Sequence, residues 1–285
     1  MAMPYDPTWR ALLRPAEGAV FFPGGRPADE AALCAELSRL SYVSFERDGA
    51  ARRLAEAALG SAGFTEVRFF SAGGTECYLA HDPLAALSAL AFRGTMGPRD
   101  AVTDVLAWRR RWPAGGTVHY GFAGALEHVW PLVLPHLRRR PGRMVYTGHS
   151  LGAALATLAA SLMAPDTLYT FGSPRVGDAA FVATLRTLPC VRTTDCCDVV
   201  CRVPPAWLGY AHLEGNQYAD RTAQLHAEPP AAYVRADQAQ ARGAYRRLHA
   251  WRWGNVWTRD LADHAPINYL SALSGRDTDG APATR

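Results

Sequence analysis

The middle of the chain alternates short apolar segments with longer alanine-rich ones, and this alternation limits the possible folds more than any other feature. Periodicity predicts strands at Arg143–Thr147, Thr167–Phe171 and Val191–Thr194, and helices at Ser150–Met163 and Asp178–Leu188. Buried strands that alternate with helices pair into a mainly parallel sheet covered on both faces. We therefore predict an α/β fold with a mainly parallel central sheet and helices on both faces.

More local patterns predict the elements on either side. Gly73-Gly74, between two segments rich in strand-forming residues, indicates a hairpin. The expected strands are Phe64–Ala72, Glu76–Ala80, Leu87–Phe92 and Thr117–Phe122, and the expected helices are Ala28–Phe45, Gly124–Leu137 and about Pro230–Trp253.

Composition narrows the class of protein. The 285 residues are 49% hydrophobic and 20% charged, which is typical of a globular chain and excludes a disordered one. We expect a single domain over 1–273 and a flexible tail over 274–285. No apolar run approaches the roughly 18 residues of a membrane span, and no secretory signal is visible, so we expect a cytoplasmic protein without an integral membrane segment. The net charge of +4 is spread out, which argues against a nucleic-acid partner.

Ser150 stands between two glycines in the stretch VYTGHSLGAAL, and this pattern carries the strongest chemical signal. Gly148-His149-Ser150-Leu151-Gly152 fits G-x-S-x-G, directly after a predicted strand and directly before a predicted helix. A nucleophilic serine on so sharp a turn needs neighbours without bulky side chains. The helix N-terminus then directs free N–H groups at developing negative charge. The alternative is a serine that only caps the helix.

A nucleophilic serine needs a base and an orienting acid. In α/β-hydrolases these follow along the chain in the order serine, Asp or Glu, histidine. That order excludes the histidines before Ser150, and His149 is a variable position of the motif itself. The order leaves His212, His226, His249 and His264 as candidate bases.

Six segments, in the same order, resemble the class 3 (fungal-type) triacylglycerol lipases, a branch of the α/β-hydrolase fold. The resemblance extends from about residue 88 to 270. It rests on Ala91–Thr95 (AFRGT), Val118–Phe122 (VHYGF), Gly148–Gly152 (GHSLG), Thr170–Asp178 (TFGSPRVGD), Asp198–Pro205 (DVVCRVPP) and Asp263-His264 with Tyr269. The second of these resembles the core strand that follows the oxyanion strand in the family.

The resemblance implies a role for each matching residue. Ser150 is the expected nucleophile, Asp198 the acid and His264 the base, with the backbone N–H groups of Thr95 and Leu151 as the oxyanion hole. Asp195 falls where the family often has Asn, and His212 falls in a stretch that is usually structural. We also expect structural roles for Asp104, His119, Arg175 and Asp178.

Two stretches depart from the family. Met96–Ala107 occupies the place of the lid, but it is only modestly hydrophobic. The region about 228–257 is long and aromatic, with Tyr245, Trp251, Trp253 and Trp257, and it predicts either a helical cap over the acyl-binding cleft or ordinary packing against the sheet.

Together these features predict a serine carboxylic-ester hydrolase that cleaves acylglycerols or similar lipid esters through an acyl-enzyme intermediate. The alternatives are a phospholipase or acyltransferase with the same triad, or a non-catalytic binding protein on this scaffold. The expected partners are a lipid or small ester substrate and, transiently, a lipid surface.

The chemistry requires no cofactor and no metal. We interpret the six cysteines as buried free thiols, with a disulfide as the lesser alternative, because Cys196, Cys197 and Cys201 lack the second cysteine pair of a typical zinc site. We also expect a bacterial source.

Overall fold

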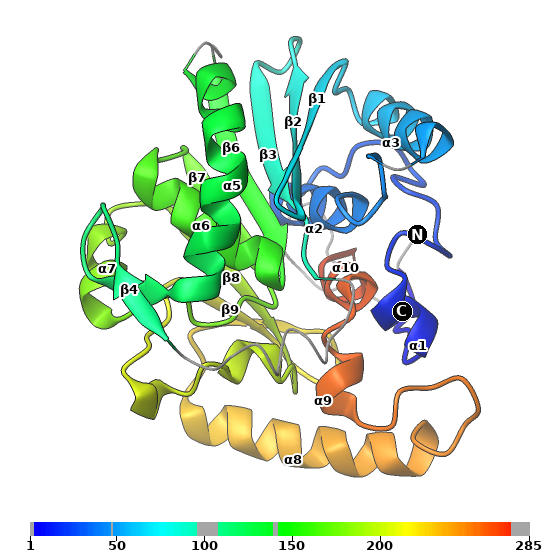
Figure 1. Cartoon of the computed structure of the whole chain (residues 1–285). Coiled ribbons are helices and arrows are strands. Elements are labelled where there is room, and N and C mark those ends of the chain that lie inside the picture. The colour runs from blue at the N-terminus through cyan, green and yellow to red at the C-terminus, as the bar shows by residue number, and fades with distance from the viewer. Residues whose placement is uncertain (1–2, 47, 96–107, 139–141, 275–285) are drawn as a thin grey trace.

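The computed structural model describes residues 3–46, 48–95, 108–138 and 142–274. Its centre is an eight-stranded sheet in the order β1-β2-β3-β6-β7-β8-β9-β10 (Figure 1). The strands are β1 (Glu66–Ala72), β2 (Thr75–Asp82), β3 (Leu87–Phe92), β6 (Arg143–His149), β7 (Thr167–Phe171), β8 (Cys190–Asp195), β9 (Asn216–Ala219) and β10 (Leu225–Ala227).

The middle of this sheet is parallel. Strands β3, β6, β7, β8 and β9 pair in parallel, in that order, and antiparallel strands flank them on both sides. The carboxyl ends of β6, β7 and β8 therefore meet at one edge of the sheet, which is where open α/β sheets place their sites. The predicted mainly parallel α/β sheet is confirmed.

Helices cover both faces of the sheet. The described helices are α1 (Trp9–Leu13), α2 (Glu30–Leu40), α3 (Gly49–Ser61), α5 (Tyr120–Leu137), α6 (Leu151–Leu162), α7 (Ala179–Thr184), α8 (Ala231–Leu248), α9 (Arg259–Ala262) and α10 (Pro266–Ser274). Alternate residues of β3 point to opposite faces of the sheet and join the core cluster on each face. Ala89 and Ala91 join the cluster that contains α2, α3 and α10, whereas Leu90 and Phe92 join the cluster that contains α5 and α6.

Local chemistry explains several element boundaries. Asp29 accepts a hydrogen bond from the Ala32 N–H at 2.8 Å, so α2 begins directly after it. Gly73 and Gly74 both have positive φ, as the tight turn between β1 and β2 requires, and the predicted hairpin is confirmed. Inside α2, the buried Arg39 pairs with Glu36 at 2.7 Å and donates to backbone carbonyls of the preceding segment.

The predicted strand Thr117–Phe122 is wrong beyond His119. The strand β5 (Thr117–His119) pairs with β4 (Arg109–Arg111) in a separate two-stranded sheet, so it is not a strand of the central sheet. The chain then turns into α5, because the His119 side chain caps that helix and accepts from the Phe122 N–H. The resemblance of Val118–Phe122 to a core strand is corrected accordingly.

The long insertion before His264 is helical where the sequence predicts it. Helix α8 lies across the bottom of Figure 1, beyond β9 and α9. Ala241 packs on Cys196, Cys197 and Tyr218, so α8 covers the turn after β8. These contacts are ordinary packing against the sheet, and the role of residues 228–257 as a cap over an acyl-binding cleft stays a prediction.

The aromatic residues of this insertion divide into two groups. Tyr245 is buried, whereas Trp251 and Trp253 are 90% and 103% exposed. The predicted lid, 96–107, lies outside the described residues, as does the predicted tail apart from Ser274. Among the helices that the structure describes, none has the length and hydrophobicity to cross a bilayer.

Candidate active site

Ser150 sits on a strained turn between β6 and α6. Its backbone has φ 59° and ψ −126°, and its side chain makes no cap hydrogen bond to the helix, so it does not act as a helix cap. A Cβ at Gly148 would lie 2.2 Å from the backbone of Gly152, and a Cβ at Gly152 would lie 2.2 Å from the Phe92 carbonyl oxygen. Both glycines are therefore sterically required.

Ser150, His264 and Asp198 form one hydrogen-bonded chain. His264 Nε2 lies 2.9 Å from Ser150 Oγ, and His264 Nδ1 lies 2.8 Å from Asp198 Oδ2. Because Nδ1 faces a carboxylate, it carries the proton, which leaves Nε2 as an acceptor for the serine hydroxyl. All three side chains are buried. The geometry is that of a nucleophile, a base and an orienting acid.

Asp198 is held as a carboxylate. Burial by itself raises its pKa, but the charge and hydrogen bond of His264 and a hydrogen bond from Tyr269 outweigh burial, so the pKa lies below its ordinary value. The Tyr269 hydroxyl donates to Asp198 Oδ2 at 2.5 Å, and the Val200 N–H donates to Oδ1 at 2.8 Å. These donors fix the carboxylate toward His264.

The other candidate acids and bases lie elsewhere. The backbone N–H of Asp195 contacts the Tyr269 hydroxyl at 3.2 Å, and it is the Asp198 carboxylate, rather than that of Asp195, that contacts His264. His212 Nε2 donates to the Cys201 carbonyl oxygen at 2.7 Å, and His226 pairs with Asp220. The His249 ring contacts the rings of Tyr5 and Tyr245 at tilted angles.

His149 lies directly beside the chain of three. Its ring centroid is 4.6 Å from that of His264, and its Nδ1 is 2.8 Å from the Tyr42 hydroxyl. Burial, and then the nearby His264, lower the pKa of His149 well below its ordinary value. His149 therefore stays neutral and adds no charge beside the base.

The segment Thr170–Asp178 supports the site from β7. Gly172 has φ 59°, and a Cβ there would lie 2.9 Å from Asp198 Oδ2 and 3.1 Å from His264 Nδ1, so only glycine leaves room for this pair. Arg175 donates to the carbonyl oxygens of Arg202 and Pro204. Asp178 caps α7 and bonds Thr117. Both side chains anchor loops, whereas Asp104 lies outside the described residues.

A narrow crevice opens beside the serine. Its volume is about 10 Å³, room for about one water molecule, and its lining residues are Leu12, Tyr42, Thr95, His149, Ser150, His264 and Pro266. Thr95 thus lies beside the nucleophile, and Leu151 is the first residue of α6. No residue of 228–257 lines this crevice.

Two residues that line the crevice, Leu12 and Tyr42, were not predicted from the sequence. Neither belongs to a motif, and each reaches the crevice from the N-terminal part of the chain only through the tertiary fold. All six cysteines are free thiols in the structure, with Cys190 half-buried and the other five buried.

Comparison with known proteins relates part of this chain to a lipase family. The sequence profile described as "Lipase (class 3)" matches residues 89–207. This segment of the chain therefore resembles the class 3 lipase family. A secreted mono- and diacylglycerol lipase 1 from Fusarium solani is 33% identical over 160 residues, which are 52% of this chain and 48% of that protein. The chain thus spans about half the length of this curated relative.

Solved structures of fungal lipases agree with the fold. A mutant form of MDLA from Penicillium cyclopium aligns with TM-score 0.54 and 26% identity over 67% of this chain and 79% of that one. The Rhizomucor miehei lipase propeptide complex aligns with TM-score 0.59 and 24% identity over 83% of this chain and 93% of that one. The class 3 lipase segment therefore lies in an α/β-hydrolase fold.

The comparisons also correct the expected location. The relatives from Fusarium and Penicillium are named as secreted lipases, which points to export and makes the expected cytoplasmic location wrong. These relatives are fungal, so the expected bacterial source finds no support.

Replacement of Gly152 by Ala should disrupt the turn at Ser150. The new methyl group would meet the Phe92 carbonyl oxygen, so we expect a loss of about 1 to 3 kcal/mol in the free energy of unfolding, measured by urea denaturation. Gly60→Ala is the matched control, because its Cβ meets nothing within 4 Å in α3, and it should leave the protein as stable or slightly more so. Equal effects of the two changes would contradict the steric account.

His149 should make stability sensitive to mild acid. Above about pH 6.5 the His149 imidazole is neutral in the folded and in the unfolded protein. Below this pH it binds a proton in the unfolded chain but stays neutral in the folded protein, where it is buried. The free energy of unfolding should therefore fall as the pH is lowered. In His149→Gln the slope between about pH 6 and pH 5 should be shallower by up to about 1.4 kcal/mol per pH unit. An unchanged slope would show that His149 is protonated in the folded protein.

Proposed function

We propose that the protein is a serine carboxylic-ester hydrolase acting on acylglycerols or similar lipid esters, with Ser150, Asp198 and His264 as its catalytic triad. The observation that carries the proposal is the buried chain from Ser150 Oγ through His264 to Asp198, with distances of 2.9 and 2.8 Å. The match of residues 89–207 to the class 3 lipase family supports the same reaction and a lipid ester as the substrate. We also propose a single domain over 1–273, supported by the one central sheet whose two faces carry the main core clusters.

Each residue of the triad has a defined task in this reaction. His264 Nε2 takes the hydroxyl proton as Ser150 Oγ attacks the ester carbonyl carbon, and the imidazolium then gives the proton to the leaving alcohol. Asp198 holds Nδ1–H and stabilises the imidazolium. Water repeats the sequence on the acyl-enzyme, so the carboxylic acid leaves and Ser150 regains its proton.

The oxyanion of the tetrahedral intermediate needs donors beside Ser150. The Leu151 N–H is the first of α6 and has the free donor and partial positive charge of a helix N-terminus. Thr95 lines the same crevice and supplies the second N–H. One donor of this kind stabilises the transition state by about 3 kcal/mol.

Replacement of Ser150 by Ala should abolish ester hydrolysis without unfolding the protein. The change removes the nucleophile but leaves the turn and both glycines intact, so we expect kcat for p-nitrophenyl esters to fall by about 10⁴-fold or more. Asp198→Asn should also reduce kcat severely, whereas Asp195→Asn should retain most of it because its carboxylate does not contact His264. Activity retained in Ser150→Ala would favour a different reaction or a binding protein.

We further propose that a lipid surface is a partner, and that a tryptophan surface composed of Leu248, Trp251, Trp253 and Trp257 contacts it. All four side chains are more than half exposed, and Arg246, Arg247 and Arg252 are exposed on the same segment. Exposed tryptophans beside arginines suit the interface of an anionic bilayer.

Helix α1 connects the tryptophan surface to the crevice at Ser150. Trp257 packs edge-on against Trp9 of α1, with ring centroids 5.5 Å apart. The backbone N–H of Trp9 also donates to the Gly254 carbonyl oxygen. Leu12 of the same helix lines the crevice. Adsorption through this surface brings the entrance close to the lipid.

The double replacement Trp251→Ala and Trp253→Ala should weaken binding to phosphatidylglycerol vesicles. Loss of the two indole rings that contact the bilayer is expected to lower the partition coefficient by about tenfold or more, with little change in the rate of hydrolysis of a soluble ester. Trp207→Ala is the control, because Trp207 is also exposed but belongs to another segment. Equal vesicle binding by all three proteins would contradict the assignment of the surface.

A further inference from the structure

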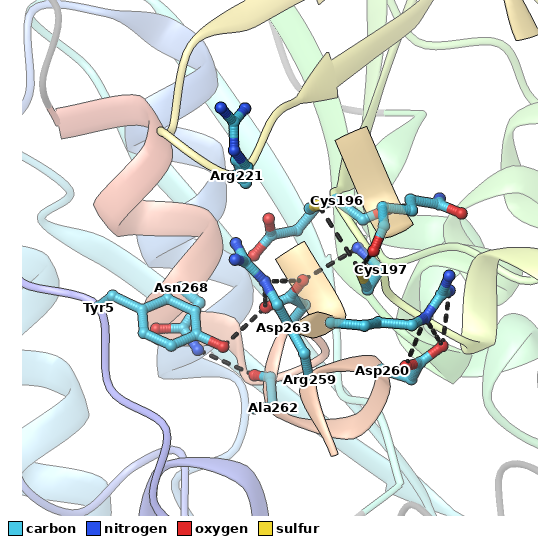
Figure 2. Close-up of polar contacts among 12 residues, drawn as sticks. Tyr5, Cys196, Cys197, Arg221, Arg259, Asp260, Ala262, Asp263 and Asn268 are labelled. Carbon is cyan, nitrogen blue, oxygen red and sulfur yellow. Dashed lines mark hydrogen bonds and ion pairs between the residues drawn. The ribbon is translucent and has the colours of Figure 1, made fainter. Parts of the chain in front are cut away.

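Two neighbouring cysteines and an aspartate come together in the interior beside the triad. Cys196 and Cys197 lie on the turn between β8 and Asp198, and Asp263 directly precedes His264 (Figure 2). All three residues are fully buried. The sulfur atoms are 3.6 Å apart, and one ligand atom from each of the three residues lies within 4.8 Å of the other two. The Cys197 N–H also donates to Asp263 Oδ2 at 2.9 Å.

The spacing of these atoms suits a tetrahedral metal ion. Zinc binds thiolate sulfur at about 2.3 Å, so two sulfur ligands of one tetrahedral ion lie about 3.8 Å apart. A fourth donor lies beside Cys196, because Asp237 Oδ2 is 3.2 Å from Cys196 Sγ, and this oxygen also accepts from the Tyr218 hydroxyl at 2.8 Å and the Arg221 backbone N–H at 3.1 Å. A sulfur and an oxygen ligand of the same ion lie about 3.5 Å apart. To complete a coordination shell, the side chains shift slightly and Asp237 Oδ2 exchanges one of its two donors for the ion.

The charges of the cluster suit a divalent ion equally well. Asp263 is paired with Arg259 at 3.0 Å and Asp237 with Arg221 at 3.0 Å, so with neutral thiols both acids are already compensated. A zinc ion that binds Cys196 and Cys197 displaces two thiol protons and adds two positive charges. The net charge of the interior is unchanged, so occupancy avoids the cost of burying an uncompensated charge.

We propose that Cys196, Cys197 and Asp263 bind a thiophilic divalent metal ion, of which Zn²⁺ is the physiological representative, with Asp237 as the fourth ligand. Cys197 precedes Asp198 in the sequence and Asp263 precedes His264. The ion therefore cross-links the acid turn and the histidine segment. The sequence analysis favours free thiols here because no second cysteine pair follows, and the oxygen ligands of the proposed site stand about 40 and 66 residues further along the chain.

Arg259 and Tyr5 are the present competitors for the Asp263 oxygens. Tyr5 donates to Oδ1 at 2.7 Å, and the Arg259 side chain contacts both oxygens (Figure 2). A carboxylate oxygen has two lone pairs, so the ion displaces one Arg259 contact and leaves the other in place. Arg259 then balances the ligand charge from the outer shell, as groups around metal ligands commonly do.

Metal content tests the site without reference to hydrolysis. The full chain is expressed with zinc in the medium and also refolded with Zn²⁺ under a phosphine reductant, so that access to the buried sulfurs does not limit binding. The expected result is one zinc ion per chain by mass spectrometry of metals after gel filtration. Replacement of the ion by Co²⁺ should give the near-ultraviolet absorption of thiolate-to-cobalt charge transfer.

Replacement of individual cysteines tests where the zinc ion binds. Cys196→Ser and Cys197→Ser should each weaken zinc binding by about tenfold or more, whereas Cys190→Ser, at the half-buried cysteine of β8, should bind zinc as the unchanged chain does. In the unchanged chain, treated with enough urea to expose the buried sulfurs, zinc should slow the alkylation of Cys196 and Cys197, a measurement that needs no variant to fold. Zinc absent from a fully reduced chain, or binding that survives both replacements, overturns the proposal. Loss of hydrolysis alone bears only on the triad.

Discussion

The strained backbone of Ser150 is the constraint on which the rest of the site depends. A non-glycine residue at φ 59° and ψ −126° costs about 1 to 3 kcal/mol, which the surrounding structure must offset. Strand β6 lies in the middle of the parallel sheet, α6 is buried on that sheet, and the Ser150 N–H is fixed by the Phe171 carbonyl oxygen at 3.0 Å. The large core thus holds a turn that an isolated strand and helix would not adopt.

The same close packing determines which residues can stand around the serine. Gly172 leaves room for the contact between Asp198 and His264, and Tyr269 orients the carboxylate from α10. The Cys197 N–H joins the acid turn to the histidine segment through Asp263. The proposed metal ion would bind at this junction, so stability of the triad and occupancy of the buried cysteines are expected to be coupled.

Short sequence motifs predicted those features whose physical cause lies within a few residues of the chain. The glycines around Ser150 and the turn at Gly73 each have a steric cause within a few residues, and the structure contains both features. The end of β5 depended on the side chain of His119, which a run of strand-forming residues does not reveal. Leu12 and Tyr42 reach the crevice, and Asp263 reaches Cys197, through long-range packing that no short motif encodes. The exposure of Trp253 was likewise not predictable, because an aromatic cluster suits a core and a surface equally well.

Covalent labelling of the folded protein by a fluorophosphonate tests the central claim most directly. The reagent reacts with a serine only where a base removes the proton and donors stabilise the resulting oxyanion, so it examines the whole triad in a single step. Peptide mass spectrometry should find one phosphonylated residue, Ser150, with labelling lost on acid unfolding and greatly slowed in His264→Asn. An unlabelled Ser150 in folded protein, or labelling at the same rate without His264, would contradict the account.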